Sequence, residues 1–493
     1  MADIDISHVK EAGEAKLKNV KNTVSSLVAS VRTEVEQKQQ KVEHTPFAIH
    51  HANLVYTYPG EGGLGKEEGE IKKDMTLVVS EEGTIEAIFP TKDTDRVSAI
   101  PATYKPLDAE GRYLLPGLIN VHTHLFNTGE SLPSNTMTKE AQAEQRQKML
   151  SGPGHVALRG MTRRMANELL YSGVTTIRTV GDIAFDTVDL RDDVQDGKVL
   201  GPRILASGPM LAGVNGHGAP LLSMECPDKE QALKNIHTLL DNGVNAVKIA
   251  ATGGVTDAKK IGDAGAPQLT EDIMAVIVEE AHKSGIIVAA HAQSLEGVKR
   301  ALRAGVDTIE HGAALDDEAL ALFHNNPKSL NGYSALTPTL SAIYPETDLD
   351  PKELDLSDVA RGNAEIVGKT MTEGAQRAVK EKLNILVGTD TAMPYVTQYN
   401  TWRELDFLVR YAGMTKAQAL FAATTENAKV LGLAEVTGAL KEGLSADLLV
   451  VNDNPLEDLR ALDKPDLVVA NGVPVWHPQA THFPKVDAAL DTL

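Results

Sequence analysis

The sequence predicts an α/β protein: a (β/α)8 barrel with a small β-sandwich domain built from both chain ends, plus an N-terminal helix. Two observations predict the barrel. Short apolar strands alternate with helical patterns through residues 116–432, and eight such units suit a fold that spans about 250 residues, or more than 400 with insertions. A third observation predicts the sandwich: alternating strands with glycine turns occur on both sides of that stretch.

Residues 1–46 are expected to form an amphipathic helix and a linker. Apolar residues such as Leu17, Val20 and Val24 recur at spacings of three and four between residues 10 and 42, and polar residues fill the gaps. A helix of this kind packs on the body of the protein or pairs with another chain. We therefore expect a homo-oligomer.

Residues 47–115 and 433–493 are expected to form the two parts of the β-sandwich domain. Strand patterns occur at 47–58 and 75–89 before the central stretch, and at 446–451 and 467–475 after it. Since both parts have the same style of short strand, the simplest interpretation is one small domain shared by the two chain ends.

Residues 116–432 are expected to form the barrel. The expected strands are 119–125, 175–180, 203–207, 246–251, 287–292, 308–311, 335–340 and 385–390. Gly285 and Gly305 follow helical segments as C-terminal caps. An open doubly wound sheet is the alternative, but it places a phosphate loop after its first strand, and Gly253-Gly254 lacks the spacing of such a loop.

The composition excludes several classes of function. The 493 residues include 48 Lys and Arg against 68 Asp and Glu, a formal net charge of −20, so binding to nucleic acid or to a membrane surface is not expected. The one cysteine, Cys226, excludes an intrachain disulfide and a thiolate zinc site. The polar, acidic N-terminus and the lack of a long apolar run favour a cytoplasmic location.

Ionisable side chains gather at the carboxyl ends of the expected strands, where barrel enzymes carry their active sites. His122 and His124 end the first strand on one face, because residues two apart on a strand point the same way. The remaining strands supply Lys248, His291, His311 and Asp390.

Each of these residues also has a structural interpretation when it is taken alone. Lys248 in an apolar strand can be a buried lysine held in a salt bridge, because an unpaired buried ammonium is costly. Asp390 can cap the following helix, and His291 can be a satisfied core histidine. Together, at matched barrel positions, the six predict a metal centre, in which a neutral Lys248 amine reacts with carbon dioxide to form a carbamate that bridges two metals.

Several motifs resemble those of the amidohydrolase superfamily of metal-dependent hydrolases. The first-strand motif is Pro116-Gly-Leu-Ile-Asn-Val-His-Thr-His124, and residues 438–458 are similar to the superfamily's return to its sheet domain. Residues 247–255, 301–312 and 388–390 most resemble the prolidase-like and Xaa-Arg dipeptidase-like branch. Imidazolonepropionases are related but lack the strand-four lysine.

The resemblance implies a binuclear site and its ligands. It assigns His122, His124 and Asp390 to one metal and His291 and His311 to the other, with carbamylated Lys248 and a hydroxide as bridges. Zinc suits such imidazole and carboxylate ligands, with manganese or iron as alternatives. Many dipeptidase-like relatives carry an aromatic or imidazole side chain where this chain has Gln293, a position expected to face substrate.

The expected reaction is hydrolysis of the amide bond of a dipeptide or an N-acyl amino acid. A bound metal makes water a nucleophile near neutral pH, and Asp390 is expected to pass its proton to the leaving nitrogen. His217 is expected to hydrogen-bond the carbonyl oxygen, or else to be a surface-loop histidine. Arg178 is expected to bind a substrate carboxylate or to pair internally with Asp182.

Two other functions stay open from the sequence. One is a single-metal aminohydrolase or an imidazolonepropionase-like hydrolase of a cyclic amide, although Glu296 then lies far from His291 and Lys248 has no task. The other is a metal-free barrel that serves as a binding or assembly module.

Overall fold

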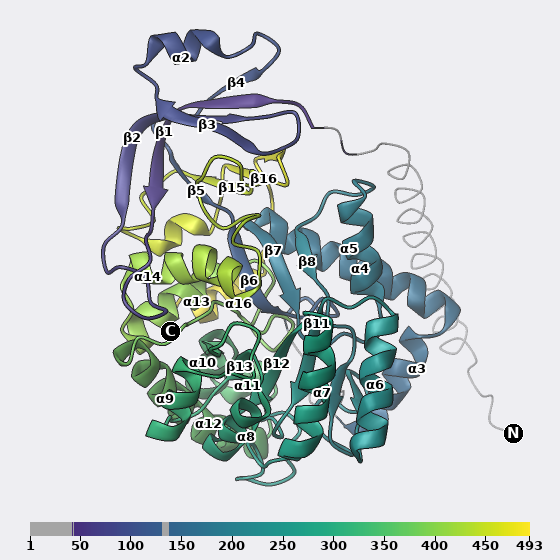
Figure 1. Ribbon diagram of the computed structural model, residues 1–493. Helices are drawn as coiled ribbons and strands as arrows, with labels where there is room; N and C mark the ends of the chain where they lie inside the picture. The colour runs from purple at the N-terminus through teal and green to yellow at the C-terminus, as the bar shows by residue number, and fades with distance from the viewer. Residues whose placement is uncertain (1–41, 43, 131–137) are drawn as a thin grey trace, which may run out of the picture.

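The computed structural model describes residues 42, 44–130 and 138–493. The expected N-terminal helix falls, apart from residue 42, outside the described residues. A sheet domain lies at one end of the molecule, and a larger body of parallel strands surrounded by helices lies below it (Figure 1).

The sheet domain combines strands from both ends of the chain. Its eight-stranded sheet has the order β17-β16-β15-β5-β1-β2-β3, and β4 pairs with β1. The strands are β1 (Phe47–Tyr56), β2 (Glu70–Val79), β3 (Ile85–Pro90), β4 (Lys105–Asp108), β5 (Tyr113–Pro116), β15 (Leu448–Val451), β16 (Leu467–Ala470) and β17 (Val473–Trp476), with the short helix α2 (Thr94–Ala99) after β3. Because β15 pairs antiparallel with β5, strands from the two ends of the chain, β5 and the yellow β15, lie side by side (Figure 1).

One face of this sheet closes around a shared apolar core. Phe47 and Ile49 of β1, Leu77 of β2, and Leu448 and Val450 of β15 belong to the same buried cluster. They alternate along their strands, as expected for a strand with one face in the core. The expected β-sandwich is therefore one continuous sheet, whose strands from the two chain ends cover a common interior.

The central region contains two parallel sheets. The first has the order β6-β7-β8 and the second the order β10-β9-β11-β12-β13-β14. The strands are β6 (Leu118–Thr123), β7 (Val174–Thr179), β8 (Arg203–Leu205), β9 (Met210–Ala212), β10 (Ser223–Glu225), β11 (Ala246–Ala250), β12 (Ile287–Ala292), β13 (Thr308–His311) and β14 (Ala335–Thr337). Seven coincide with expected strands, and the short strands β9 and β10 were not predicted.

The segment expected as the eighth strand is irregular. Within 385–390, Ile385 forms a single bridge with Leu336 of β14. On its other side the segment bonds to β6: Val121 N donates to Val387 O at 3.0 Å, and Asp390 N donates to His122 O at 2.9 Å. The segment therefore connects the two sheets, although it is not a regular strand. A second connection joins β8 of the first sheet to β11 of the second. Ala246 N, at the start of β11, donates to the carbonyl oxygen of Ala206, which follows β8, at 3.2 Å.

Helices surround these strands (Figure 1). They are α3 (Lys139–Met149), α4 (Gly152–Tyr171), α5 (Asp186–Gln195), α6 (Lys229–Asp241), α7 (Glu271–Lys283), α8 (Leu295–Ala304), α9 (Asp317–His324), α10 (Leu340–Asp348), α11 (Pro351–Leu354), α12 (Asp358–Lys380), α13 (Thr401–Phe407), α14 (Lys416–Phe421), α15 (Asn427–Val430) and α16 (Pro484–Leu490). Local sequence sets their ends. Ser294 accepts a hydrogen bond from Gly297 N at the start of α8, and Gly305 ends that helix with a φ of 101°, as predicted.

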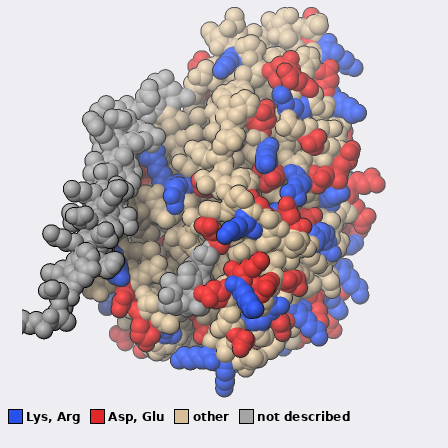
Figure 2. Space-filling view, turned by 180° about the vertical axis from the view of Figure 1, so that it is seen from behind, with Lys and Arg blue, Asp and Glu red and all other residues tan. Residues whose placement is uncertain are grey.

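The outer surface mixes charges of both signs. On the face in Figure 2, acidic and basic side chains are interspersed rather than gathered by sign. None of the helices formed by the described residues is long and apolar enough to cross a membrane.

Candidate metal centre and active-site cavity

A cavity of about 280 Å³ opens at the carboxyl ends of the parallel strands. All six expected metal ligands line it, together with His217 and Gln293, two of the three other expected site residues. The ligands are His122, His124, Lys248, His291, His311 and Asp390. The structure therefore brings together residues that span more than half of the chain. Phe126 and Met393 also line this cavity.

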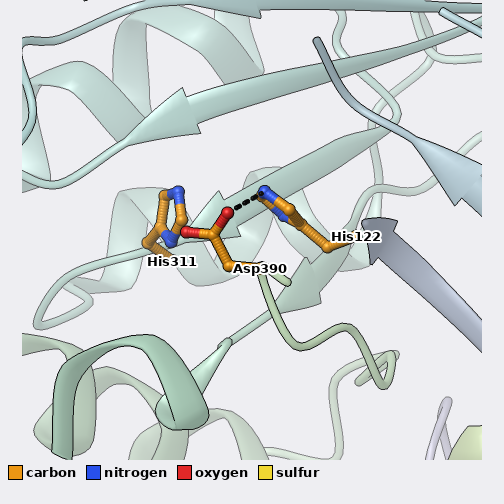
Figure 3. Close-up of side chains that lie close together, drawn as sticks. All are labelled: His122, His311 and Asp390. Atoms are coloured by element: carbon orange, nitrogen blue, oxygen red, sulfur yellow. Dashed lines mark ion pairs between the residues drawn. The ribbon is translucent and has the colours of Figure 1, made fainter. Parts of the chain in front are cut away.

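Asp390 lies at the centre of the histidines. Its Oδ1 is 3.3 Å from His122 Nε2 and 3.1 Å from His124 Nε2. His122, His311 and Asp390 each offer an atom within 4.8 Å of the other two, and Figure 3 shows the carboxylate between the two imidazoles. Gly388 permits this approach, because a Cβ there would lie 2.6 Å from His122 Cβ.

Hydrogen bonds fix the tautomer of the two histidines on β6. His122 donates from Nδ1 to Glu310 Oε2 at 2.7 Å, since the carboxylate can only accept. His124 donates from Nδ1 to the carbonyl oxygen of Gly181 at 2.9 Å. In both rings the other nitrogen, Nε2, faces Asp390 Oδ1.

The other two histidines are held in the same manner. His311 Nδ1 lies 2.7 Å from Thr339 Oγ1, whose own proton goes to the carbonyl oxygen of Pro338, so the imidazole donates and Nε2 stays open. His291 donates from Nε2 to the carbonyl oxygen of Gly253 at 3.2 Å. Its buried Nδ1 has no hydrogen-bond partner among the described residues. Each of the four imidazoles is thus anchored through one ring nitrogen, as metal-binding histidines are.

The electrostatic surroundings keep these groups in metal-binding forms. Burial, reinforced by the charges of His217 and His311, holds the pKa of His291 well below its ordinary value. Burial also holds the pKa of His311 well below its ordinary value, although Asp390 opposes the shift. Burial alone would raise the pKa of Asp390, but the charges and hydrogen bonds of neighbouring histidines outweigh it and hold that pKa well below the ordinary value. Neutral His291 and His311 imidazoles beside an ionised carboxylate suit divalent metals.

Lys248 lies in the middle of β11 and is buried, with an exposed fraction of 2%. Burial lowers the pKa of its amine to about 8, although the charges of Glu310 and Asp390 act in the opposite direction. Among the described residues, no hydrogen bond or ion pair engages its Nζ. The structure therefore does not support the simple salt-bridge interpretation, and burial favours the neutral amine.

Arg178 is the expected site residue that the structure places elsewhere. Its buried guanidinium donates to Glu310 Oε1 and to the carbonyl oxygen of Val121, both at 2.7 Å, and to Thr308 Oγ1 at 3.0 Å. It does not line the cavity. The expected contact with a substrate carboxylate is wrong, and the internal pair forms with Glu310 instead of Asp182, because the side chain points from β7 into the interior between strands.

His217 lies in the cavity wall, so the surface-loop interpretation is also wrong. Its Nδ1 makes a short contact with Asp257 Oδ2, and its ring stacks on His291 with a centroid separation of 4.0 Å. A glycine is needed at position 254, because a Cβ there would lie 2.6 Å from the His217 ring. Gln293 also faces the cavity, and its buried Oε1 has no partner among the described residues.

Sequence reasoning missed four acidic residues around the site. Glu310 holds His122 and Arg178, Asp257 contacts His217, and Glu346 lines the cavity. Glu404 accepts hydrogen bonds from two backbone N–H groups at the start of α10. Glu310 had a visible signal, since it directly precedes His311 in a buried strand.

Comparison with known proteins agrees with this geometry. A model of the amidohydrolase family matches residues 113–475. The chain belongs to the amidohydrolase family. The match begins at β5 and ends within β17, so it includes the parallel strands and part of the sheet domain.

Individual members of the family are similar over much of the chain. A solved structure described as a putative prolidase from Bifidobacterium longum is 47% identical, with a TM-score of 0.78, and the match covers 92% of this chain and 99% of that one. The ochratoxinase of Aspergillus niger is 27% identical over 328 residues, which are 61% of this chain and 64% of that protein. The match thus spans less than two thirds of that relative. An imidazolonepropionase from Mesorhizobium japonicum is 23% identical over 376 residues, 72% of this chain and 82% of that protein.

Proposed function

We propose that the protein is a metal-dependent hydrolase of the amide bond in dipeptides or N-acyl amino acids. One observation carries the proposal. Four imidazoles, each anchored through one ring nitrogen, line the same cavity beside an ionised Asp390 and a buried Lys248. Family membership and the likeness to a putative prolidase support it.

The proposed framework is a closed (β/α)8 barrel within residues 116–432, flanked by the two parts of a sheet domain at 47–115 and 433–493. The backbone hydrogen bonds of Val121 and Asp390 on one side, and of Ala246 on the other, support closure because they connect the two parallel sheets. Seven strands and the 385–390 segment then form the ring, with the cavity at their carboxyl ends.

Two divalent metal ions, with zinc favoured by the ligand types, are proposed to bind here. His122, His124 and Asp390 would hold one ion and His291 and His311 the other, with Lys248, as its carbamate, between them. Bound there, the metals would supply a nucleophilic water at neutral pH and polarise the substrate carbonyl.

The protein's own groups carry the proton. Asp390, ionised and held by two histidines, accepts a proton from the attacking water at a carboxylate oxygen and gives it to the leaving nitrogen. His217 is proposed to hydrogen-bond the substrate carbonyl oxygen through Nε2; since its Nδ1 already donates to the Asp257 carboxylate, this takes the imidazolium form, in which both ring nitrogens are donors. Gln293 presents an amide to the substrate, and its buried oxygen can accept a hydrogen bond from an N–H group.

A second candidate is a hydrolase with a single metal, such as one that opens a cyclic amide. The tight group of His122, His311 and Asp390 favours it, because three ligand atoms within 4.8 Å of one another are enough for one ion. The likeness to an imidazolonepropionase gives further support. A barrel without metals that acts as a binding module is the remaining alternative.

Metal analysis and a substrate screen test these candidates together. We expect about two equivalents of metal per chain, and release of free amino acid from dipeptides or N-acyl amino acids by metal-reconstituted protein. One equivalent with turnover of cyclic amides favours the second candidate. Protein that takes up no metal and hydrolyses neither class contradicts the proposal.

Lys248→Ala tests the proposed carbamate. We expect it to remove most bound metal and activity, with partial rescue by short carboxylic acids that occupy the place of the carbamate. Unchanged metal content without rescue would count against the bridge. The homo-oligomeric state and the cytoplasmic location stay predictions.

A further inference from the structure

Glu404 is a buried acidic residue near the metal centre that the proposed mechanism does not use. It lies on α13, its side chain is fully buried, and it does not line the cavity. Its Oε1 accepts a hydrogen bond from Leu340 N at 2.9 Å, and its Oε2 accepts one from Ser341 N at 2.6 Å. The carboxylate of one helix therefore caps the first turn of another, α10.

The residue that would ordinarily cap α10 is engaged elsewhere. Thr339 precedes the helix, and a threonine in this place commonly accepts a hydrogen bond from an N–H group of the first turn. Here its side chain makes no such bond. Its hydroxyl instead accepts the proton of His311 Nδ1 at 2.7 Å and donates to the carbonyl oxygen of Pro338 at 2.8 Å. Glu404 satisfies the N–H groups that Thr339 leaves without a cap.

The backbone is strained at both ends of the hydrogen bond between His311 and Thr339. Thr339 has a φ of 50° and a ψ of 47°, and His311 has a φ of 69°. The left-handed region is rare for a β-branched residue, and such strain persists only where the surroundings hold it. The two N–H groups that directly follow Thr339 are those that Glu404 binds. Without this carboxylate, Thr339 is free to leave the conformation that directs its hydroxyl at His311.

Helix α13 is also tied to the strand that carries His122. Asn120 Nδ2 donates to Thr401 Oγ1 at the start of α13, and His122 N donates to Asn120 Oδ1, both at 3.1 Å. The imidazoles of His122 and His311 lie on either side of Asp390 (Figure 3), with a centroid separation of 5.1 Å. Since α13 contacts the holders of both rings, it fixes their spacing.

We propose that Glu404 is a positioning residue of the metal centre. By capping α10 it keeps Thr339 in the conformation that accepts the His311 proton, and it thereby directs His311 Nε2 at the metal. The proposal rests on the proposed metal-dependent function. It holds for two metals or for one, because His311 is a ligand in both candidates.

Glu404→Gln tests the role of the carboxylate. The amide keeps the shape, but its NH₂ group cannot accept a hydrogen bond from the second backbone N–H group. Burial raises the pKa of Glu404 to about 7, although hydrogen bonds from Ser341 and Leu340 oppose the shift, so the measurements are made at pH 8. We expect the affinity for at least one equivalent of Zn²⁺, measured by competition with a chelator, to fall by about 10- to 100-fold.

Asp406→Asn on the same helix is the matched control. Asp406 pairs with Arg410 at the protein surface, so this change should leave the Zn²⁺ affinity unaltered. An unchanged affinity in folded Glu404→Gln overturns the proposal.

A double-mutant cycle tests whether Glu404 acts through Thr339. Thr339→Val keeps the shape and removes the hydroxyl, and it should weaken Zn²⁺ binding about as much as Glu404→Gln does. The double variant should then match the weaker single variant to within about threefold, because both changes break the same chain of contacts. Losses that multiply overturn the proposal. An unchanged affinity in Thr339→Val alone also overturns it, which keeps the proposal testable if Glu404→Gln fails to fold.

Nuclear magnetic resonance of metal-free protein with ¹⁵N-labelled histidine separates this inference from the proposed function. The signals absent from His311→Asn identify His311, and we expect the Nδ1-protonated tautomer in the unaltered protein and a mixture of tautomers in Glu404→Gln. Such a change in a protein that takes up no Zn²⁺ would support the positioning of His311 and refute the proposed function. An unchanged tautomer overturns the inference, and hydrolysis by the same protein would leave the proposed function intact.

Discussion

The two interiors of this protein are built in opposite ways. The core of the eight-stranded sheet is built on an apolar cluster, with Phe47, Leu77 and Leu448 among its members. The interior at the carboxyl ends of the parallel strands buries Arg178 and Glu310 together with four histidines, a lysine and further carboxylates. Apolar burial stabilises a fold by about 25 cal/mol per Å² without specifying any chemistry, whereas each buried charge must be compensated.

The comparison shows that a buried charge in this protein is stabilised by a partner of opposite charge. Glu310 receives hydrogen bonds from both Arg178 and His122. Burial would raise its pKa, but the Arg178 charge and these contacts hold the pKa well below the ordinary value. Lys248 and Glu346 differ, because both are buried at the cavity without a hydrogen-bonded or ion-paired partner among the described residues.

The largest expected effect separates catalysis from folding. Asp390→Asn keeps the size of the side chain but cannot accept the proton, so kcat/KM should fall by about 10²- to 10⁴-fold. The apolar sheet core is untouched, so the thermal unfolding midpoint should stay close to that of the unaltered protein. Asp453→Asn, at an exposed position, is the matched control. Retained turnover in Asp390→Asn would remove this residue from the mechanism.

Glu310→Gln should disturb both chemistry and stability, because it breaks the compensation in the charged interior. The buried Arg178 loses its counter-charge, at a cost of about 3–5 kcal/mol. His122 loses the acceptor that orients it, which should weaken metal affinity by about 10- to 100-fold. Urea unfolding of metal-free protein and titration against a competing chelator measure the two effects. Unchanged values in both would contradict the role assigned to Glu310.

Leu448→Ala addresses the apolar interior alone. It leaves a cavity in the core of the sheet domain, and the free energy of unfolding should fall by about 2–5 kcal/mol. At temperatures where the variant is folded, kcat and KM should match those of the unaltered protein. A lower kcat in fully folded protein would show that the two interiors are coupled more closely than the structure indicates.

The smallest expected effect concerns the dependence of stability on pH. The pKa of Glu346 rises from 4.5 to about 8 on folding. Between these pH values the folded protein keeps a proton that the unfolded chain releases, so its contribution to the free energy of unfolding falls as pH rises and is constant above pH 8. Glu346→Gln should therefore leave stability near pH 4.5 unchanged and raise it at pH 9 by about 1–3 kcal/mol. Urea midpoints of metal-free protein at the two pH values measure this, and parallel shifts would contradict it.

Much of the fold could be predicted from the sequence because its strands are locally distinct. The strands at 287–292 and 308–311 coincide with β12 and β13, since apolar residues between glycine-capped helices define them. The short strands β9 and β10 could not be predicted, because three residues carry no periodic signal. The irregularity of 385–390 also depends on tertiary structure, since Gly388 packs against His122.

The site, like the fold, could be predicted from the sequence only in part. The six proposed ligands could be located because strand ends in a barrel converge. Glu310 was not predicted as a site residue, because adjacent residues of a strand normally point to opposite faces and its neighbour His311 was already assigned to the cavity. His311 has a φ of 69°, which ends the alternation, so both Glu310 and His311 turn inward. Asp257 and Glu346 lie outside the strands, and their approach to the cavity depends on long-range packing.

The pairing of β5 with β15 has a consequence for how the protein is made. Pro116 and Leu448 are partners in this pairing, although about 330 residues separate them in the chain. During synthesis β5 is made long before β15. Until β15 has been made, the edge of β5 that pairs with it exposes unpaired backbone groups. We expect chains interrupted before residue 448 to aggregate or to be degraded even when their parallel strands are complete.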